Sequence, residues 1–219
     1  MGNSFFVVQA NAVSGEDAEL NRWYNEQHLD DCLACDTAIS TQRFGKVPGS
    51  GPGGYAYLAL YEVGDPQKFA ENRRTKEGTP LLPRTAALAL PAHAFFYRSL
   101  EGQPGLLARQ ERCSFYIEFL DVGSGEDVVG FLKDRQKVLG AINGIGVTQL
   151  MLVEDYQERT GWHADAIIFA EVLGTAEPSW QPSAPASPGS ALRVAEAGLY
   201  QSLSPRRLRP EPAVGGALT

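Results

Sequence analysis

A tyrosine and a histidine stand four residues apart, at Tyr24 and His28, in a stretch with the period of a helix. Residues at this spacing lie one helical turn apart on the same face, so both side chains can reach one bound molecule. An imidazole titrates near neutral pH, and beside a phenol it could act as general base or acid without an electron carrier. The alternative is a structural histidine whose ring nitrogens bond to backbone groups near the helix end.

An arginine on a neighbouring expected strand, Arg43, could bind an anion. A buried guanidinium needs a carboxylate or an anionic ligand, and we expect it to hold a substrate carboxylate or phenolate. Strand alternation predicts that Gln9, Asn11 and Tyr57 are neutral hydrogen-bond partners in the same cavity. The alternative for the arginine is a structural ion pair with one of three aspartates, Asp30, Asp31 or Asp36.

Aromatic residues surround these candidates in the sequence. Trp23 directly precedes Tyr24, and we expect its indole to contact the substrate. Aromatic side chains more often serve as plain core, and that alternative applies to the whole set. Its members are Trp23, Phe44, Tyr55, Tyr57, Phe95 and Tyr97.

The other histidines, the cysteines and the glycine-rich loop form no metal or cofactor motif. His93 and His163 have no ligand spacing with carboxylates or cysteines, and Cys32 and Cys35 close a helix where a redox pair should open one. The glycines of residues 45–54 lack the spacing of a dinucleotide or phosphate loop, which favours a lid or a plain hairpin loop. We expect no metal and no cofactor, and the lack of Cys-x-x-Cys-His leaves only haem ligation without covalent attachment open.

A repeated tetrapeptide indicates that the chain is doubled. Ser-Gly-Glu-Asp stands at Ser14 to Asp17 and again at Ser124 to Asp127, about half the chain apart. Each copy follows an apolar run and precedes a helical pattern, so we expect the serine to cap the helix. The second copy has lost the tryptophan, tyrosine and histidine, whose places are taken by Lys133, Asp134 and Val138. Any chemistry is therefore expected in the first half.

The elements expected around these motifs follow the order β-α-β-β-α-β in each half. Periodicity predicts helices at 16–35, 66–76, 125–139 and, weakly, 191–197. Strands are expected at 5–12, 38–44, 55–63, 92–100, 113–122, 147–154, 164–172 and 199–208. Pro178 to Gly189 is rich in proline, serine and alanine and is interpreted as an irregular loop.

This pattern predicts an α+β fold made of two ferredoxin-like repeats, residues 1–104 and 105–209, followed by a disordered tail at 210–219. A single such sheet leaves one face bare, and an exposed apolar sheet is a liability. Tyr57 and Leu58 show that neither face of their strand is simply polar. We therefore expect the two sheets to cover each other and to enclose an apolar chamber.

Composition restricts the partners of this chain. It has 219 residues, 43% of them hydrophobic and 21% charged, and a formal net charge of −7. Binding to nucleic acid or to an anionic membrane needs clustered basic residues, so neither partner is expected. The basic cluster of Arg206, Arg207 and Arg209 stands near the end of the sequence and is interpreted as a solvated terminus. Because the start of the sequence shows no export signal, a cytoplasmic protein is expected.

The segments Glu19 to Leu29 and Thr41 to Phe44 resemble the first unit of dimeric α/β-barrel proteins, specifically the EthD-like group with its Trp-Tyr-x-x-x-His helix. The sequence departs from that pattern at Asp30, Asp31 and Cys32. The resemblance implies a barrel that relatives assemble from two chains and that this chain could close by itself, as a pseudo-dimer. Relatives include polyketide cyclases, small monooxygenases, lyases and haem enzymes, and a homodimer of the whole chain is a further expectation.

Together these observations predict a cofactor-independent lyase for a small aromatic or polyketide-like acid. His28 would move the proton, Tyr24 would assist it, and Arg43 would hold the anion, with Trp23 and Asn11 contacting the substrate. Tyr57 would add a further substrate contact. A cofactor-free monooxygenase or cyclase in the same cavity is the second hypothesis. A small-molecule-binding accessory protein without catalysis is the third.

Overall fold

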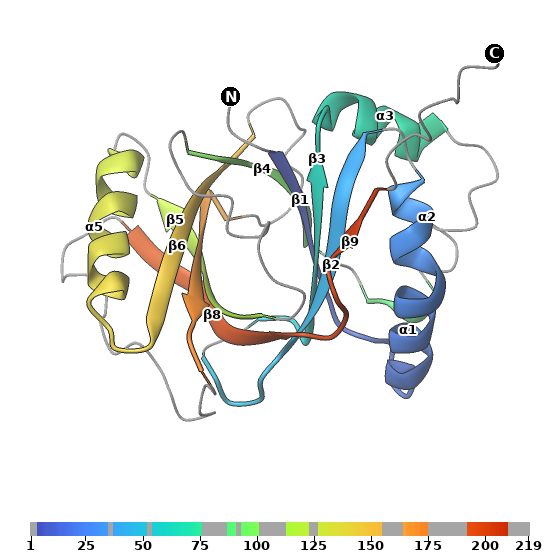
Figure 1. Ribbon diagram of the computed structural model, residues 1–219, viewed down its shortest axis with the longest axis horizontal. Coiled ribbons are helices and arrows are strands. Elements are labelled where there is room, and N and C mark those ends of the chain that lie inside the picture. Colours follow the sequence, from blue (N-terminus) through green and yellow to red (C-terminus); the bar gives the residue numbers. More distant parts are fainter. Residues whose placement is uncertain are drawn as a thin grey trace, which may run out of the picture.

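The structure of the protein, a computed structural model, describes nine segments of the chain (Figure 1). They are residues 4–34, 37–51, 54–75, 87–90, 93–100, 113–122, 127–154, 164–174 and 192–209. No helix within these segments is both long and apolar enough to cross a membrane.

Eight strands form one closed antiparallel barrel. Around it they follow the order β3, β1, β4, β6, β7, β5, β8 and β2, and the pairing of β2 with β3 closes the ring. A short ninth strand pairs with Ser40 and Thr41, near the start of β2. The strands are β1 (Ser4–Ala10), β2 (Ala38–Lys46), β3 (Tyr57–Val63), β4 (His93–Ser99), β5 (Ser114–Val122), β6 (Ile145–Val153), β7 (Ala166–Val172), β8 (Leu192–Ser202) and β9 (Arg207–Leu208).

Alternation along each strand separates the inside of the barrel from its outside. In β1 the rings of Phe5 and Phe6 point to opposite faces, the first into the barrel and the second toward the helices. The interior is packed with buried apolar side chains from both halves of the chain, and the rings of Phe44 and Phe115 meet there with centroids 5.6 Å apart. The described side chains inside the barrel therefore form one apolar core that both halves of the chain share.

Helices cover the barrel on two opposite sides (Figure 1). On one side lie α1 (Asp17–Trp23), the π-helical turn η1 (Tyr24–His28), α2 (Leu29–Leu33) and α3 (Pro66–Thr75), which share a core with the outer faces of β1 and β3. On the other side α5 (Val128–Gly140) packs on β6 and β7. Each helix buries its apolar stripe against a sheet face, as amphipathic helices do.

The predicted fold class, two ferredoxin-like repeats with separate sheets, is wrong. The strands do not form two sheets that cover each other face to face, because the outer strands pair edge to edge across the halves. β2 pairs with β8 and β4 with β6, so one barrel replaces the two expected sheets and few helices remain around it. Closure buries the apolar inner faces of the strands, which the two expected sheets would have covered by packing on each other. The boundary near residue 104 falls in residues 101–112, outside the described segments, and stays a prediction.

Two expected local features are also wrong. The first helix is not capped by Ser14: Glu16 is its N-cap residue and makes no side-chain capping bond. The helix after the second tetrapeptide, α5, has Asp127 as its N-cap residue. The carboxylate of Asp127 accepts a bond of 2.9 Å from the N–H of Gly130. The short helix expected at 191–197 is instead part of β8, because β5 pairs with it over most of its length. Pro178 to Gly189 and residues 210–219 lie outside the described segments.

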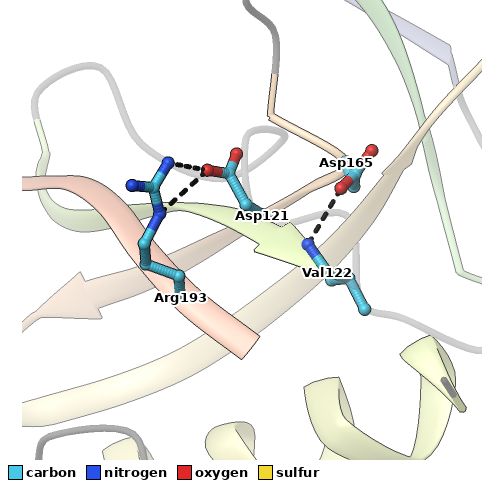
Figure 2. A network of polar contacts seen from close by, with 4 residues as sticks. All are labelled: Asp121, Val122, Asp165 and Arg193. Carbon is cyan, nitrogen blue, oxygen red and sulfur yellow. Dashed lines mark hydrogen bonds and ion pairs between the residues drawn. The ribbon is translucent and has the colours of Figure 1, made fainter. Parts of the chain in front are cut away.

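A polar network fixes the end of β5 against β7 and β8 (Figure 2). The carboxylate of Asp165 accepts a bond of 2.8 Å from the N–H of Val122, and its own N–H donates to the carbonyl of Leu120. Beside it, Arg193 pairs with Asp121 across the β5–β8 ladder. Because that ion pair is exposed, it contributes little stability, and the bond to Asp165 does more to hold the strand end.

Candidate active site

A π-helical turn positions the aromatic rings of the candidate site. Tyr24 and His28 are the first and last residues of this turn, which lies inside one continuous helical run from Asp17 to Leu33. The wider turn brings Trp23, five positions before His28, onto the same face, with ring centroids 4.4 Å apart. Such turns are rare and are often found at functional sites.

His28 is buried between the helix and the outer face of the barrel, with 8% of its surface exposed. Its ring meets Tyr24 edge to face at 4.5 Å and lies 6.4 Å from the ring of Tyr61 on β3. On the following turn the Sγ of Cys32 lies 3.7 Å from Nε2 of the imidazole. The imidazole is therefore enclosed by aromatic rings and one thiol, in surroundings that exclude most water.

Arg43 extends from β2 toward the same helix. It is 1% exposed, and its guanidinium carbon lies 4.4 Å from the ring centroids of both Tyr24 and Tyr57. Its Nη1 donates a bond of 2.6 Å to the side-chain oxygen of Asn21. Nη2 has no hydrogen-bond partner among the described residues, and no carboxylate of these residues forms an ion pair with it. Burial lowers the pKa of this guanidinium, and the neighbouring tyrosines oppose that shift.

Tyr57 links this cation to the solvent side of the cluster. Its hydroxyl donates a bond of 2.7 Å to Asp17 and accepts one of 3.1 Å from the amide of Asn21. Burial, followed by the bond to Asp17, raises the pKa of the Tyr57 phenol. The phenol therefore stays protonated near neutral pH and can serve as a hydrogen-bond donor.

The structure brings together most of the residues expected in the site. Tyr24, Trp23, His28, Arg43 and Tyr57 form one cluster, but it lies outside the barrel, under the helix. Asn11 does not join it, because its side chain accepts a bond of 2.8 Å from the N–H of Ala56. Gln9, the other residue expected here, faces the opposite side of β1 and contacts Glu196 on β8.

Sequence reasoning missed two residues that orient the cluster, Asp17 and Asn21. Both follow the same helical steps that relate Tyr24 to His28, since Asn21 stands three residues before the tyrosine and Asp17 four before Asn21. That signal was present in the sequence. Their partner, Tyr57, comes from β3 and could be joined to them only through the fold.

Two neighbouring arginines, Arg206 and Arg207, bind the segment around β9 to the barrel and to the helix of the site. Arg207 on β9 ion-pairs with Asp30 at 2.6 Å and donates to the carbonyl of Asn25 inside the π-turn. Arg206 ion-pairs with Glu62 on β3 at 2.7 Å and donates to the hydroxyl of Ser40. The interpretation of these residues as a solvated terminus is therefore wrong, and Asp30 is paired with Arg207 and not with Arg43.

Metal ligation has no support in the described segments, where no three histidine, cysteine, aspartate or glutamate side chains gather closely enough to hold an ion. His93 packs its ring on Tyr55 at 5.0 Å. Cys35, Asp36 and His163 lie outside these segments.

Comparison with solved structures places the fold among known ones. A protein described as anthrone oxidase-like superposes with a TM-score of 0.65 at 12% identity, over 96% of this chain and 94% of that one. A provisionally named monooxygenase from Lactobacillus acidophilus NCFM gives 0.52 at 10% identity, over 95% and 97% of the two chains. A provisionally named chlorite dismutase gives 0.53 at 9% identity, over 80% of each chain.

The fold that these solved structures share with this chain agrees with the barrel that the resemblance in the sequence implied. The EthD-like group and the tandem form are not confirmed. No protein-family model matches the sequence, and no curated protein matches it either. At this low identity the likeness concerns the fold alone, because sites are grafted on folds.

Proposed function

We propose that this protein is a small-molecule enzyme that moves a proton on a small aromatic or polyketide-like acid without a cofactor. The reaction would be of the lyase type: a dehydration, a decarboxylation or a retro-aldol cleavage. The site is the cluster under the π-turn, with His28 as the proton carrier, Tyr24 as its assistant and Arg43 as the anion-binding group.

The observation that carries this proposal is the state of Arg43. Its guanidinium is buried without a carboxylate among the described residues, and one of its nitrogens has no hydrogen-bond partner there. Burying an unpaired charge is costly, so a ligand that supplies the opposite charge would be bound favourably here. The flanking faces of Tyr24 and Tyr57 favour a flat aromatic ligand, whose carboxylate or phenolate would reach the free edge of the guanidinium.

With the acid held there, the chemistry follows from the neighbouring groups. The imidazole of His28 would take the proton from the substrate, and the negative charge that develops would be stabilised by Arg43 and by the phenol of Tyr24. In a dehydration the imidazolium would give this proton to the departing hydroxide, and in a retro-aldol cleavage to the enolate that is left. In a decarboxylation no proton is taken first, and the imidazolium would protonate the carbanion that remains when carbon dioxide leaves. The aromatic surroundings of His28 support this role, because a site that excludes water strengthens these electrostatic interactions.

Cofactor-free oxygenation is the second candidate, since it begins with the same proton removal. The observation that favours it is the enclosure of His28 by Trp23, Tyr24 and Tyr61, which would shield an electron-rich substrate anion. That anion would then react with dioxygen in place of losing a group. Turnover measured with and without dioxygen separates the two reactions. An accessory protein that only binds would return every ligand unchanged in mass.

The experiment is a screen of aromatic and polyketide-like acids with mass-spectrometric detection, on the wild-type protein and on His28→Gln. We expect at least a ~100-fold loss of turnover in the variant, the size of a lost general base. Lys137→Gln, at an exposed site on α5, is the matched control. Near wild-type turnover by the folded His28→Gln protein contradicts the proposal.

A further inference from the structure

A second group of ionisable side chains lies at one mouth of the barrel, away from the π-turn. Lys46 on β2 stands directly opposite Tyr200 on β8, whose side chain belongs to the interior cluster, and Glu196 lies four residues before Tyr200 on the same strand. On β1, which does not pair with β8, the side-chain amide of Gln9 donates a bond of 3.0 Å to the carboxylate of Glu196. His93 is the partner of Gln9 in the β1–β4 ladder. Polar groups from four strands thus cap the apolar interior.

Two glycines leave room for this arrangement. A Cβ at Gly198 would collide with the Cε of Lys46, so the lysine stem lies directly on the β8 backbone. Gly54, with a φ of +88°, belongs to the glycine-rich stretch that follows β2. A Cβ there would lie 2.8 Å from Nζ of Lys46 and 3.5 Å from both Oε2 of Glu196 and Oη of Tyr200. An amine, a carboxylate and a phenol therefore surround one small point that no side chain of Gly54 fills.

We propose that this mouth is a second reactive site, in which Lys46 condenses with a small uncharged aldehyde or ketone and Glu196 carries the protons. The neutral amine attacks the carbonyl carbon and its proton passes to the new alkoxide oxygen through the carboxylate. The carboxylate of Glu196 then takes the remaining N–H proton and delivers it to the hydroxyl, the C–O bond breaks and water leaves, and an imine joins the lysine to the carbon. One carbonyl oxygen departs as water, so the step needs no oxidant or reductant.

The surroundings of the amine and of the carboxylate support this assignment. The Lys46 amine donates to the carbonyl of Gly51 over a long 3.5 Å. Burial lowers the pKa of Lys46, and the charge of Glu196 opposes that shift. A larger share of the amine is therefore neutral near physiological pH than on an exposed lysine, as imine chemistry requires. The carboxylate makes an anionic carbonyl compound a poor ligand, which is why the proposed class is uncharged.

Reductive trapping of the full-length protein tests this site. The probe is propanal with cyanoborohydride near neutral pH, and peptide mass spectrometry measures the alkylation rate of each lysine. We expect Lys46 to react at least severalfold faster than the exposed Lys137, because burial leaves more of its amine neutral. Equal or slower reaction at Lys46 overturns the proposal. In Lys46→Arg the fast site should disappear while the rate at Lys137 stays the same.

Glu196→Gln distinguishes a proton carrier from a simple ion-pair partner. If the carboxylate moves the protons, its loss slows alkylation at Lys46 even though the amine becomes less basic. If Glu196 only pairs with Lys46, its loss frees the amine and alkylation becomes faster. The sign of the change therefore decides the matter, with Lys137 as the internal standard. These measurements do not involve the cluster under the π-turn, so their outcome does not depend on whether the protein is the proposed lyase.

Discussion

The functional proposal depends most on one side chain, because Arg43 is a buried cation with only a neutral hydrogen-bond partner, Asn21, among the described residues. Its neighbours show why the sequence could predict a site here. Tyr24 and His28 share a helix face by spacing alone, whereas the contact of Arg43 with Asn21 and Tyr57 depends on how the helix lies on the barrel. The helical period can be derived from a short stretch of sequence, whereas the packing of a helix on a strand depends on the whole fold.

Arg43→Met should separate binding from stability. Removing a buried, uncompensated charge should leave the free energy of unfolding unchanged or raise it by about 1–4 kcal/mol. Affinity for an aromatic acid such as salicylate should fall by about 2 kcal/mol, the size of a hydrogen bond to a charged group. Urea unfolding and calorimetric titration measure the two effects, and Arg193→Met, at an exposed site, is the control. A strongly destabilised Arg43→Met protein would mean that the arginine is structural.

Cys113 should be a slow thiol. It lines a surface hollow of about 390 Å³ with Ser114 and Glu171, so a small reagent can approach it. Burial raises its pKa from 9.0 to about 11, and the reactive thiolate is correspondingly scarce near neutral pH. Iodoacetamide should therefore alkylate Cys113 about 100-fold more slowly in the folded than in the unfolded protein. The rate should climb as the pH rises from 9.0 toward about 11, and a flat profile would contradict this.

At the scale of elements, the first helix was predicted nearly to its ends, but its π-turn was not. A π-turn shifts the hydrogen bonds by one residue, and nothing in the residues of Tyr24 to His28 requires that shift. The error at 191–197 has a different cause. Alanine and glutamate in that stretch favour a helix, but pairing with β5 overrides local preference. The role of β9 was missed because Arg206 and Arg207 find their partners only in the folded chain.

The attachment of β9 predicts an order of stabilities. Arg206 and Glu62 have side chains 13% and 10% exposed, so Arg206→Ala removes the ion pair with Arg206 from a nearly buried carboxylate and should cost about 3–5 kcal/mol. Asp30 is 62% exposed, and Arg207→Ala should cost only about 1 kcal/mol. Urea denaturation measures both. Replacing Arg206 and Glu62 together by leucine should recover most of the loss, and a double variant as unstable as the single one would refute the pairing argument.

For the whole molecule, the two sides of the barrel treat buried charge differently. Under α5 the guanidinium of Arg135 is neutralised by Glu118, which is fully buried and accepts a bond of 2.8 Å. Under the π-turn Arg43 has no such carboxylate among the described residues. This difference in buried charge agrees with the proposed lyase site under the π-turn. Assembly into a homodimer and residence in the cytoplasm remain predictions.

The two halves of the barrel are joined by two strand pairings, each of which consists of few residue pairs. β2 meets β8 through three residue pairs and β4 meets β6 through three, whereas β5 and β8 share nine. What unites the halves is mainly the shared apolar interior, to which Phe44 and Phe115 belong. The chain should therefore tolerate being split within residues 101–112, with the two co-expressed fragments reassembling by complementation. Each fragment alone would expose its half of the interior and aggregate. Co-purification of the two fragments as a one-to-one complex would show that the halves can assemble without a covalent link.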